Sequence, residues 1–223
     1  MVLALPSFQL MAAEAWHQAL ADMPLRANVQ QLNRSNCVDI MLRSFQSNTV
    51  VKALIFMPGA TDELYLFRRV KANLTTTSPS LLDAVSALTN QTHIYATFHP
   101  PFLLLHTDED PLEPDYVIED QPTSTKLQAA RPIPYLLCND RDWDFLQPIL
   151  KHSLRVDLRP WRHSMDSWHF YRHSFAAWNL TGREALETAA YAGKSKFVIG
   201  RKRVSFKEDP RVRATPVLES YPR

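Results

Sequence analysis

The chain has little glycine and little cysteine, and it has no long apolar run. Its 223 residues include 4 Gly and 2 Cys against 16 Pro. Because tight turns usually rely on glycine, we expect connections that are stiffened by proline. No stretch approaches the roughly 20 apolar residues that a membrane-spanning helix needs, so no membrane span is predicted. The 45% hydrophobic content excludes disorder by composition and suits one compact domain or two small ones.

The two cysteines exclude a disulfide framework. Cys37 and Cys138 lie far apart in the sequence and fit either one disulfide or a pair of buried thiols. We expect free, buried thiols, which pack like small apolar side chains. The chain also lacks a serine-nucleophile motif, a phosphate-binding loop and a dinucleotide fingerprint, so no complete catalytic motif is present.

The first residues, MVLALPSFQLMAAEA, contain a short apolar run that ends in small residues. Such a run is typical of the tail of a signal peptide, but the positively charged start of one is missing. The segment is therefore either a truncated signal or an ordinary leading segment. The run favours a periplasmic or secreted location over a cytoplasmic one.

Local signals agree best in the stretch 78–106. Ser78 can cap a helix while Pro79 takes its first position, where the missing N–H costs nothing. Residues 94–98 alternate between apolar and polar, which predicts a half-buried strand. Two prolines interrupt that strand, and the apolar run 102–105 predicts an antiparallel return. The predicted core residues of this unit are Leu81, Val85, Leu88, Ile94 and Phe98.

A similar order of elements precedes this stretch. The apolar periodicity predicts a short helix over 15–21, a strand over 27–32, a helix capped by Ser35 or Asn36, and a central strand over 50–57. A shift of 43 residues, without a gap, lays these elements on the later unit, with Ser35 on Ser78. We therefore expect a duplicated β-α-β unit.

These units resemble a known family. A strand, the amphipathic helix SLLDAVSAL and the pair Gln91–Thr92 before a second strand are similar to the small βαβ units of secretin N-domains and of the short N-terminal domains of TonB-linked receptors. The resemblance covers residues 27–106, although those units usually carry a glycine where this chain has His93, and no secretin core or receptor barrel follows. It implies a non-catalytic module of the cell envelope that packs against copies of itself or a partner, and it transfers no catalytic residue.

Residues 107–133 are predicted to be an acidic linker. Between Asp108 and Asp120 the chain carries seven carboxylates, two prolines and no Lys or Arg. We expect this linker to divide a duplicated domain, residues 1–106, from a second α/β portion, residues 134–223.

Formal charge is polarised along the chain. Residues 1–150 carry 10 basic and 16 acidic side chains, net −6, whereas residues 151–223 carry 15 and 7, net +8. The two parts can therefore attract each other. In the basic portion we predict a helix beginning near Asn139, a strand over 154–158, a helix between a Thr181–Glu184 capping box and Gly193, and a hairpin over 196–207 that turns at Gly200.

The stretch 161–178 is the candidate chemical site, because it holds three of the five tryptophans and three of the eight histidines. If residues 164–179 form a helix, His169 and His173 lie one turn apart, the spacing with which one helix offers two imidazoles to a metal. His163 is the third candidate ligand. This interpretation is a metal-dependent enzyme or metal-binding protein, with zinc or another divalent transition metal as cofactor. In the other interpretation the aromatic side chains form core and no cofactor binds.

The preferred function is a non-catalytic binding or assembly module with a protein partner or self-association, because no catalytic constellation is complete. Arg201 and Arg203 of the predicted hairpin, and Trp161 and Trp168, are the candidate binding residues. A basic hairpin also permits nucleic-acid binding as an alternative.

The basic hairpin offers few aromatic rings. Phe197 and Phe206 are its aromatic residues, and base stacking needs an exposed aromatic platform. We therefore expect the hairpin to dock on an acidic protein surface, of this chain or a second copy. The predicted fold class is α+β: two βαβ units that form a mixed sheet with helices on one face, followed by a smaller α/β portion.

Overall fold

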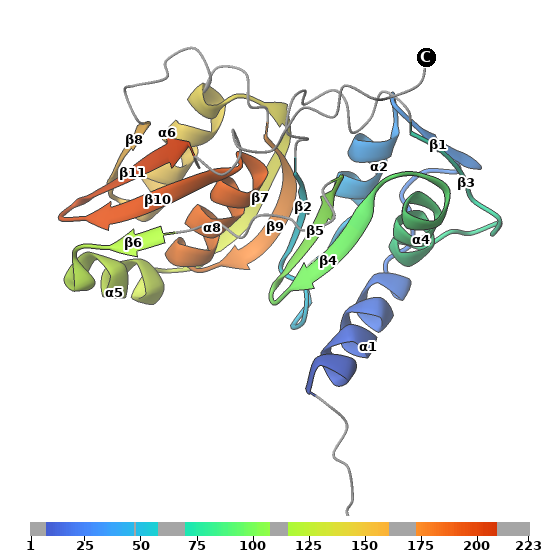
Figure 1. The fold of residues 1–223 in the computed structure, drawn as a ribbon, viewed down its shortest axis with the longest axis horizontal. Coiled ribbons are helices and arrows are strands. Elements are labelled where there is room, and N and C mark those ends of the chain that lie inside the picture. The colour runs from blue at the N-terminus through green and yellow to red at the C-terminus, as the bar shows by residue number, and fades with distance from the viewer. Residues whose placement is uncertain (1–7, 47, 58–69, 108–115, 161–172, 209–223) are drawn as a thin grey trace, which may run out of the picture.

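The computed structural model describes residues 8–46, 48–57, 70–107, 116–160 and 173–208, whose strands form three sheets (Figure 1). The largest sheet has the order β4–β5–β2–β9–β7, formed by β2 (Ala53–Phe56), β4 (Tyr95–His99), β5 (Phe102–His106), β7 (Ile133–Arg141) and β9 (His173–Leu180). The second has the order β6–β10–β11–β8, formed by β6 (Tyr116–Ile118), β8 (Asp157–Pro160), β10 (Ser195–Gly200) and β11 (Arg203–Glu208). The third pairs β1 (Gln31–Asn33) with β3 (Lys71–Asn73).

Strand β2 is the centre of the five-stranded sheet. It pairs parallel with β5 and antiparallel with β9, and all four of its residues are buried. Because side chains alternate along a strand, Ala53 and Ile55 face one side of the sheet while Leu54 and Phe56 face the other. An unbroken apolar run is what a strand covered on both faces requires.

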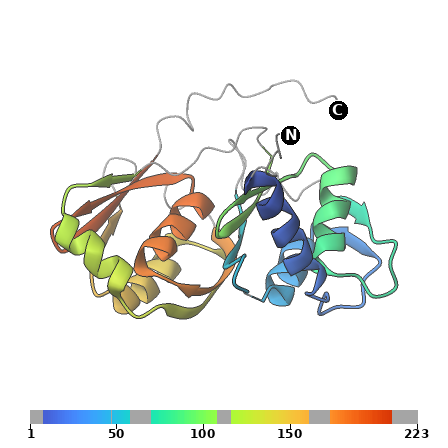
Figure 2. The same ribbon diagram turned by 90° about the horizontal axis from the view of Figure 1, so that it is seen from below.

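One face of this sheet packs against α1 (Phe8–Ala21), α2 (Cys37–Ser44) and α4 (Leu81–Gln91). The predicted apolar stripe of α4 is confirmed, since Leu81, Val85 and Leu88 are buried in that layer. Seen from below, α1 and α4 lie side by side (Figure 2).

The opposite face packs against α8 (Gly182–Ala192), with α5 (Gln121–Ala129) and α6 (Trp143–Leu154) beside it. Helix α8 contacts β9 and β2 of the large sheet and β10 of the four-stranded sheet, so it lies between the two (Figure 1). Four of its eight buried residues are alanines, whose small side chains let both sheets approach the helix closely.

The α+β class is confirmed, and the chain runs β1–α2–β2 and then β3–α4–β4, which gives the two predicted strand–helix–strand units. Their arrangement differs from the prediction. The first strands of the two units pair with each other, while β2 and β4 lie on either side of β5. Helices also cover both faces of the large sheet, because β2 and β5 are apolar on both sides.

The predicted boundary between residues 1–106 and 134–223 runs through one hydrogen-bonded sheet, since β2 pairs with β9 and β9 with β7. The described part of the predicted linker is itself structured. It forms β6 and α5, and Asp120 caps α5 by accepting the backbone N–H of Thr123. The prediction of a linker used the charge and proline content of the segment. That content gives no information on which strands pair in a sheet.

Helix ends follow local hydrogen bonding. Helix α4 is capped by Ser80, in a capping box with Asp83, and not by Ser78 as predicted. The backbone stays extended up to Ser80 because the carbonyl of Pro79 accepts the N–H of Leu25 and Ser80 bridges to Pro24. Helix α6 is likewise capped by Asp142 where Asn139 was predicted.

Two predictions in the basic portion are confirmed. Thr181 and Glu184 form the capping box of α8, which ends at Gly193. Strands β10 and β11 form the antiparallel hairpin, although the left-handed residue of its turn is Lys202 (φ 60°) and not Gly200.

The two cysteines are free and buried, as predicted. Cys37 packs in the layer of α1, α2 and α4, whereas Cys138 packs in the layer of α8. Burial raises the pKa of each thiol to about 12, so both are protonated and poor nucleophiles at neutral pH.

The burial of Leu88 yields a prediction of stability. Its side chain is 0% exposed, so Leu88→Ala removes buried methyl groups and leaves a cavity. We expect a loss of about 2–5 kcal/mol in the free energy of unfolding, measured by equilibrium denaturation. Asn90→Ala, on the exposed side of the same helix, is the control and should change stability by less than about 0.5 kcal/mol. A loss for Leu88→Ala as small as that of the control would contradict the packing of α4.

Candidate functional site

The predicted metal site is not supported by the local structure of its one described histidine. His173 lies on β9, so the predicted helix over 164–179 is wrong from His173 onward. Pairing with β2 and β7 decides the conformation here and overrides the spacing of aromatic residues. The other predicted residues of this stretch, His163, His169, Trp161 and Trp168, lie outside the described residues.

His173 is packed inside the protein and is 1% exposed. Its ring centroid lies 6.0 Å from that of Trp143, and a Cβ added at Gly193 would lie 2.8 Å from its Nε2. Within the described ranges, no group of three or more His, Cys, Asp or Glu side chains is arranged to hold a metal ion. The described surroundings of His173 are therefore those of a core residue.

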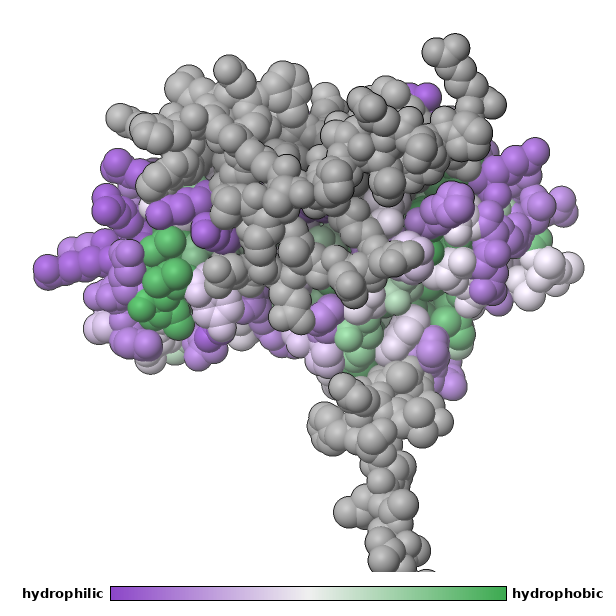
Figure 3. Space-filling model, viewed as in Figure 1, coloured by the Kyte–Doolittle hydropathy of each residue, from purple (hydrophilic) through white to green (hydrophobic). Residues whose placement is uncertain are grey.

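The basic hairpin β10–β11 presents Arg201 and Lys202 in its turn and Arg203 at the start of β11. Phe197 and Phe206 are fully buried and face α6 and α8, so neither offers an exposed ring for a base to stack on. Figure 3 shows hydrophilic side chains gathered over this end of the molecule, around an apolar patch at β6.

The acidic segment and the basic hairpin meet within the chain. Strand β6 pairs parallel with β10, and the backbone N–H groups of Glu119 and Asp120 donate to the carbonyl of Ile199. Hydrogen bonds from Thr123 hold the pKa of Asp120 below its ordinary value, and the nearby charge of Arg201 contributes to the same shift. The described end of the acidic stretch therefore lies at the hairpin, joined to it by backbone hydrogen bonds.

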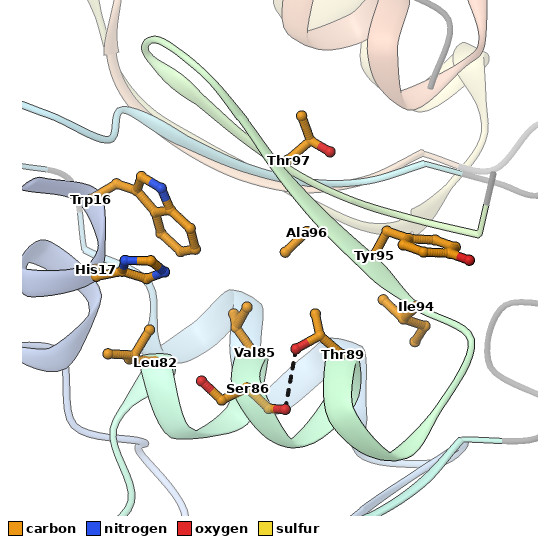
Figure 4. A pocket seen from close by; sticks show the side chains of 10 residues that line it. All are labelled: Trp16, His17, Leu82, Val85, Ser86, Thr89, Ile94, Tyr95, Ala96 and Thr97. Atoms are coloured by element: carbon orange, nitrogen blue, oxygen red, sulfur yellow. Dashed lines mark hydrogen bonds between the residues drawn. The ribbon is translucent and has the colours of Figure 1, made fainter. Parts of the chain in front are cut away.

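A groove between α1, α4 and β4 is the most promising binding site in the described structure. Its volume is about 360 Å³. Its ten lining residues include no Asp, Glu, Lys or Arg (Figure 4): Trp16, His17, Leu82, Val85, Ser86, Thr89, Ile94, Tyr95, Ala96 and Thr97.

Each wall of the groove comes from a different element. Trp16 extends from α1, and its ring centroid lies 6.1 Å from that of Phe98 on β4. Val85 points up from α4 and Ala96 points toward it from β4, whereas Thr97 points away (Figure 4). Thr97 instead shares a hydrogen bond of 2.8 Å with Nε2 of His106 on β5. The two faces of β4 therefore differ, since Ala96 faces α4 while Thr97 is hydrogen-bonded to His106 on the opposite side.

Strand β4 is an edge of the large sheet, since β5 is its one partner among the described strands. Pro100 and Pro101 cannot donate hydrogen bonds, so His99 and Phe102 form the hydrogen-bonded pair that closes the β4–β5 hairpin. Such pairs alternate along an antiparallel ladder. Ala96 and Phe98 therefore direct their backbone N–H and C=O groups away from β5.

The edges of the two larger sheets differ in how they are protected against strand addition. β7 has a bulge between Cys138 and Arg141 and contains a proline, and β8 contains charged residues and ends at Pro160. β6 has only 3 residues. Bulges, prolines, charges and short length are the usual devices that prevent edge pairing. The five-residue strand β4 (YATFH) has an unbroken register and none of these devices within it.

The sequence patterns predicted a helix over 15–21, a helix after residue 78 and a strand over 94–98, but not a groove between them. Amphipathic periodicity identifies the buried face of each element. It carries no information on which strand ends a sheet or which helix lies beside it.

No family model, curated protein or solved structure matches this chain. No helix in the described ranges is long and apolar enough to cross a membrane.

The basic hairpin generates a prediction about nucleic acid. Because its two aromatic rings are buried, we expect fluorescent DNA and RNA oligomers to show no micromolar binding to the full chain at low salt. Arg201→Glu with Arg203→Glu should leave that result unchanged. Micromolar binding that this double variant abolishes would contradict the prediction and establish the hairpin as a nucleic-acid site.

Proposed function

We propose that the chain is a non-catalytic binding module that adds an extended segment of a partner protein to the free edge of β4. The observation that carries the proposal is the position of the groove, which lies directly beside β4, an edge of the large sheet among the described strands that contains no bulge, proline or charged residue. Strand addition of this kind gains affinity from main-chain hydrogen bonds and specificity from pockets for alternate side chains.

The geometry provides for both contributions. The outward N–H and C=O groups of Ala96 and Phe98 can pair with an added strand, because β5 occupies only the other side of β4. Side chains of that strand that lie on the same face as Ala96 would enter the groove between α1 and α4. Three of the residues that line the groove, Trp16, Val85 and Ile94, are buried in the core of this layer, so packing holds them in place.

The family resemblance supports a role in assembly. The sequence of residues 27–106 resembles the βαβ units of secretin N-domains and TonB-receptor N-terminal domains, although in this structure the two strands of each unit lie in different sheets. We retain from it the proposal of a module in the cell envelope that joins protein chains to one another.

The test of this proposal removes one outward-facing amide. Ala96→Pro deletes the N–H of Ala96 but no hydrogen bond of the β4–β5 ladder. Peptides selected from a displayed random library against the wild-type chain should bind Ala96→Pro at least about tenfold more weakly. The peptide loses one backbone hydrogen bond, and the proline ring keeps its backbone from approaching β4 closely. Titration with labelled peptide measures this change.

Ala96→Ser is the matched control, because it keeps both the backbone amide and the small side chain. It should bind within about twofold of wild type, and circular dichroism should show both variants folded. Equal binding to wild type and Ala96→Pro, or a library that yields no binding peptide, would count against strand addition at β4.

A further inference from the structure

We propose that the outer face of the four-stranded sheet binds an extended acidic segment of another protein. This surface is separate from β4, so the inference does not rest on the proposed function. Side chains alternate along a strand, and the residues of β10 and β11 that alternate with the buried Phe197 and Phe206 point to the outer face. Together with a neighbouring residue of β6, the residues of this face are Val117, Lys196, Val198, Arg203, Ser205 and Lys207.

The helices that pack on this sheet lie on its other side. Helices α5, α6 and α8 are all found there, where the apolar side chains of β10 and β11 are buried against them (Figure 2). On the outer face, Val117 is 49% exposed and Arg203 is exposed. A partner can therefore reach these residues without displacing a described helix.

Positive charge is concentrated on the two central strands of this face. Lys196 of β10 lies directly opposite Lys207 of β11, and Arg203 lies on the same side of β11. Like charges on directly opposite residues of neighbouring strands repel each other. A carboxylate placed over this pair is attracted by both ammonium groups, so the face favours a negatively charged partner.

The nearby acidic residues of the same chain do not neutralise this charge. Asp157 of β8 is paired with Arg159, with Oδ2 and Nε 2.6 Å apart, and the carboxylate of Glu119 lies beside the hairpin turn. Within the described ranges, neither Lys196 nor Arg203 forms an ion pair. We therefore assign the complementary carboxylates to a separate protein chain.

The spacing of the outward residues fits an extended partner. Lys207, Ser205 and Arg203 are successive outward residues of β11, so they lie about 7 Å apart along the strand. Alternate side chains of an extended segment have the same spacing, and carboxylates at alternate positions can therefore lie along this row. The apolar patch at β6, where Val117 is exposed, offers a neighbouring contact for an uncharged side chain (Figure 3).

An acidic protein segment suits this face better than a nucleic acid. None of its outward residues is aromatic, whereas the rings of Tyr116 and Phe206 lie 5.3 Å and 5.7 Å from that of the buried Phe197. Bases of a single strand need exposed rings on which to stack. Carboxylates need only the positive charges.

The test uses fluorescent twelve-residue peptides in which serine alternates with glutamate, glutamine or lysine. In anisotropy titrations at low salt we expect the glutamate peptide to bind the full chain at least about tenfold more tightly than the other two. Its affinity should fall with added salt, because the screening length decreases from about 30 Å at about 0.01 M to about 8 Å at about 0.15 M.

Two charge-reversal variants locate the binding face. Lys196→Glu with Arg203→Glu should abolish binding of the glutamate peptide. Arg34→Glu with Lys71→Glu is the matched control, because it changes the net charge equally at exposed positions near the β1–β3 pair. The control should bind within about twofold of wild type, and circular dichroism should show both variants folded. Ala96→Pro should also retain binding, since β4 is not part of this face.

Several results would overturn the inference. These are equal binding of the glutamate and glutamine peptides, absence of binding at low salt, or a loss in the control as large as that in Lys196→Glu with Arg203→Glu. A DNA oligomer that binds this face more tightly than the glutamate peptide would make nucleic acid the partner. Sedimentation that shows a low-salt dimer abolished by the same double variant would make a second copy the occupant. Each of these outcomes leaves strand addition at β4 untouched.

Discussion

The structure depends on the pairing of β2 with β5 on one side and with β9 on the other. These three strands join segments that are far apart in the sequence into one sheet, and β2 is buried on both faces. One ion pair reinforces the junction: Nζ of Lys52 lies 2.8 Å and 3.0 Å from the two carboxylate oxygens of Glu184. Because Glu184 also completes the capping box of α8, the same carboxylate fixes where that helix begins against the sheet.

Strands at the centre of the sheet are paired on both sides. Another chain can therefore hydrogen-bond to the sheet backbone only at the edge strands. At one edge, the bulge of β7 breaks the regular register, and Tyr135 packs against Trp178 on β9. At the other, β4 keeps a regular register, with α4 lying against one of its faces and Trp16 of α1 near Phe98. Among the described residues, the two edges therefore differ: β7 is irregular, whereas β4 is regular and has a groove beside it.

Local patterns predicted local structure well and pairing poorly. The stripe of α4 and the capping box of α8 follow from residues within one helix, so periodicity and capping chemistry suffice to find them. The helix considered over residues 164–179 rested on aromatic residues that recur at helical spacing, and it included residues 173–179. They form β9 because Phe175 fits between Ile55 of β2 and Cys138 of β7, partners that are distant in the sequence. The groove was not predicted for the same reason, because it is lined by three elements that are separate in the sequence.

Amide hydrogen exchange at β4, read residue by residue by NMR, tests the central claim most directly. In the free chain the N–H groups of Tyr95, Thr97 and His99 should be protected by β5, whereas those of Ala96 and Phe98 should exchange rapidly. A bound library-selected peptide should slow exchange at Ala96 and Phe98 and leave β7 unchanged. Protection that appears at β7 instead, or exchange at Ala96 and Phe98 that stays fast when the peptide is bound, would contradict strand addition at this edge.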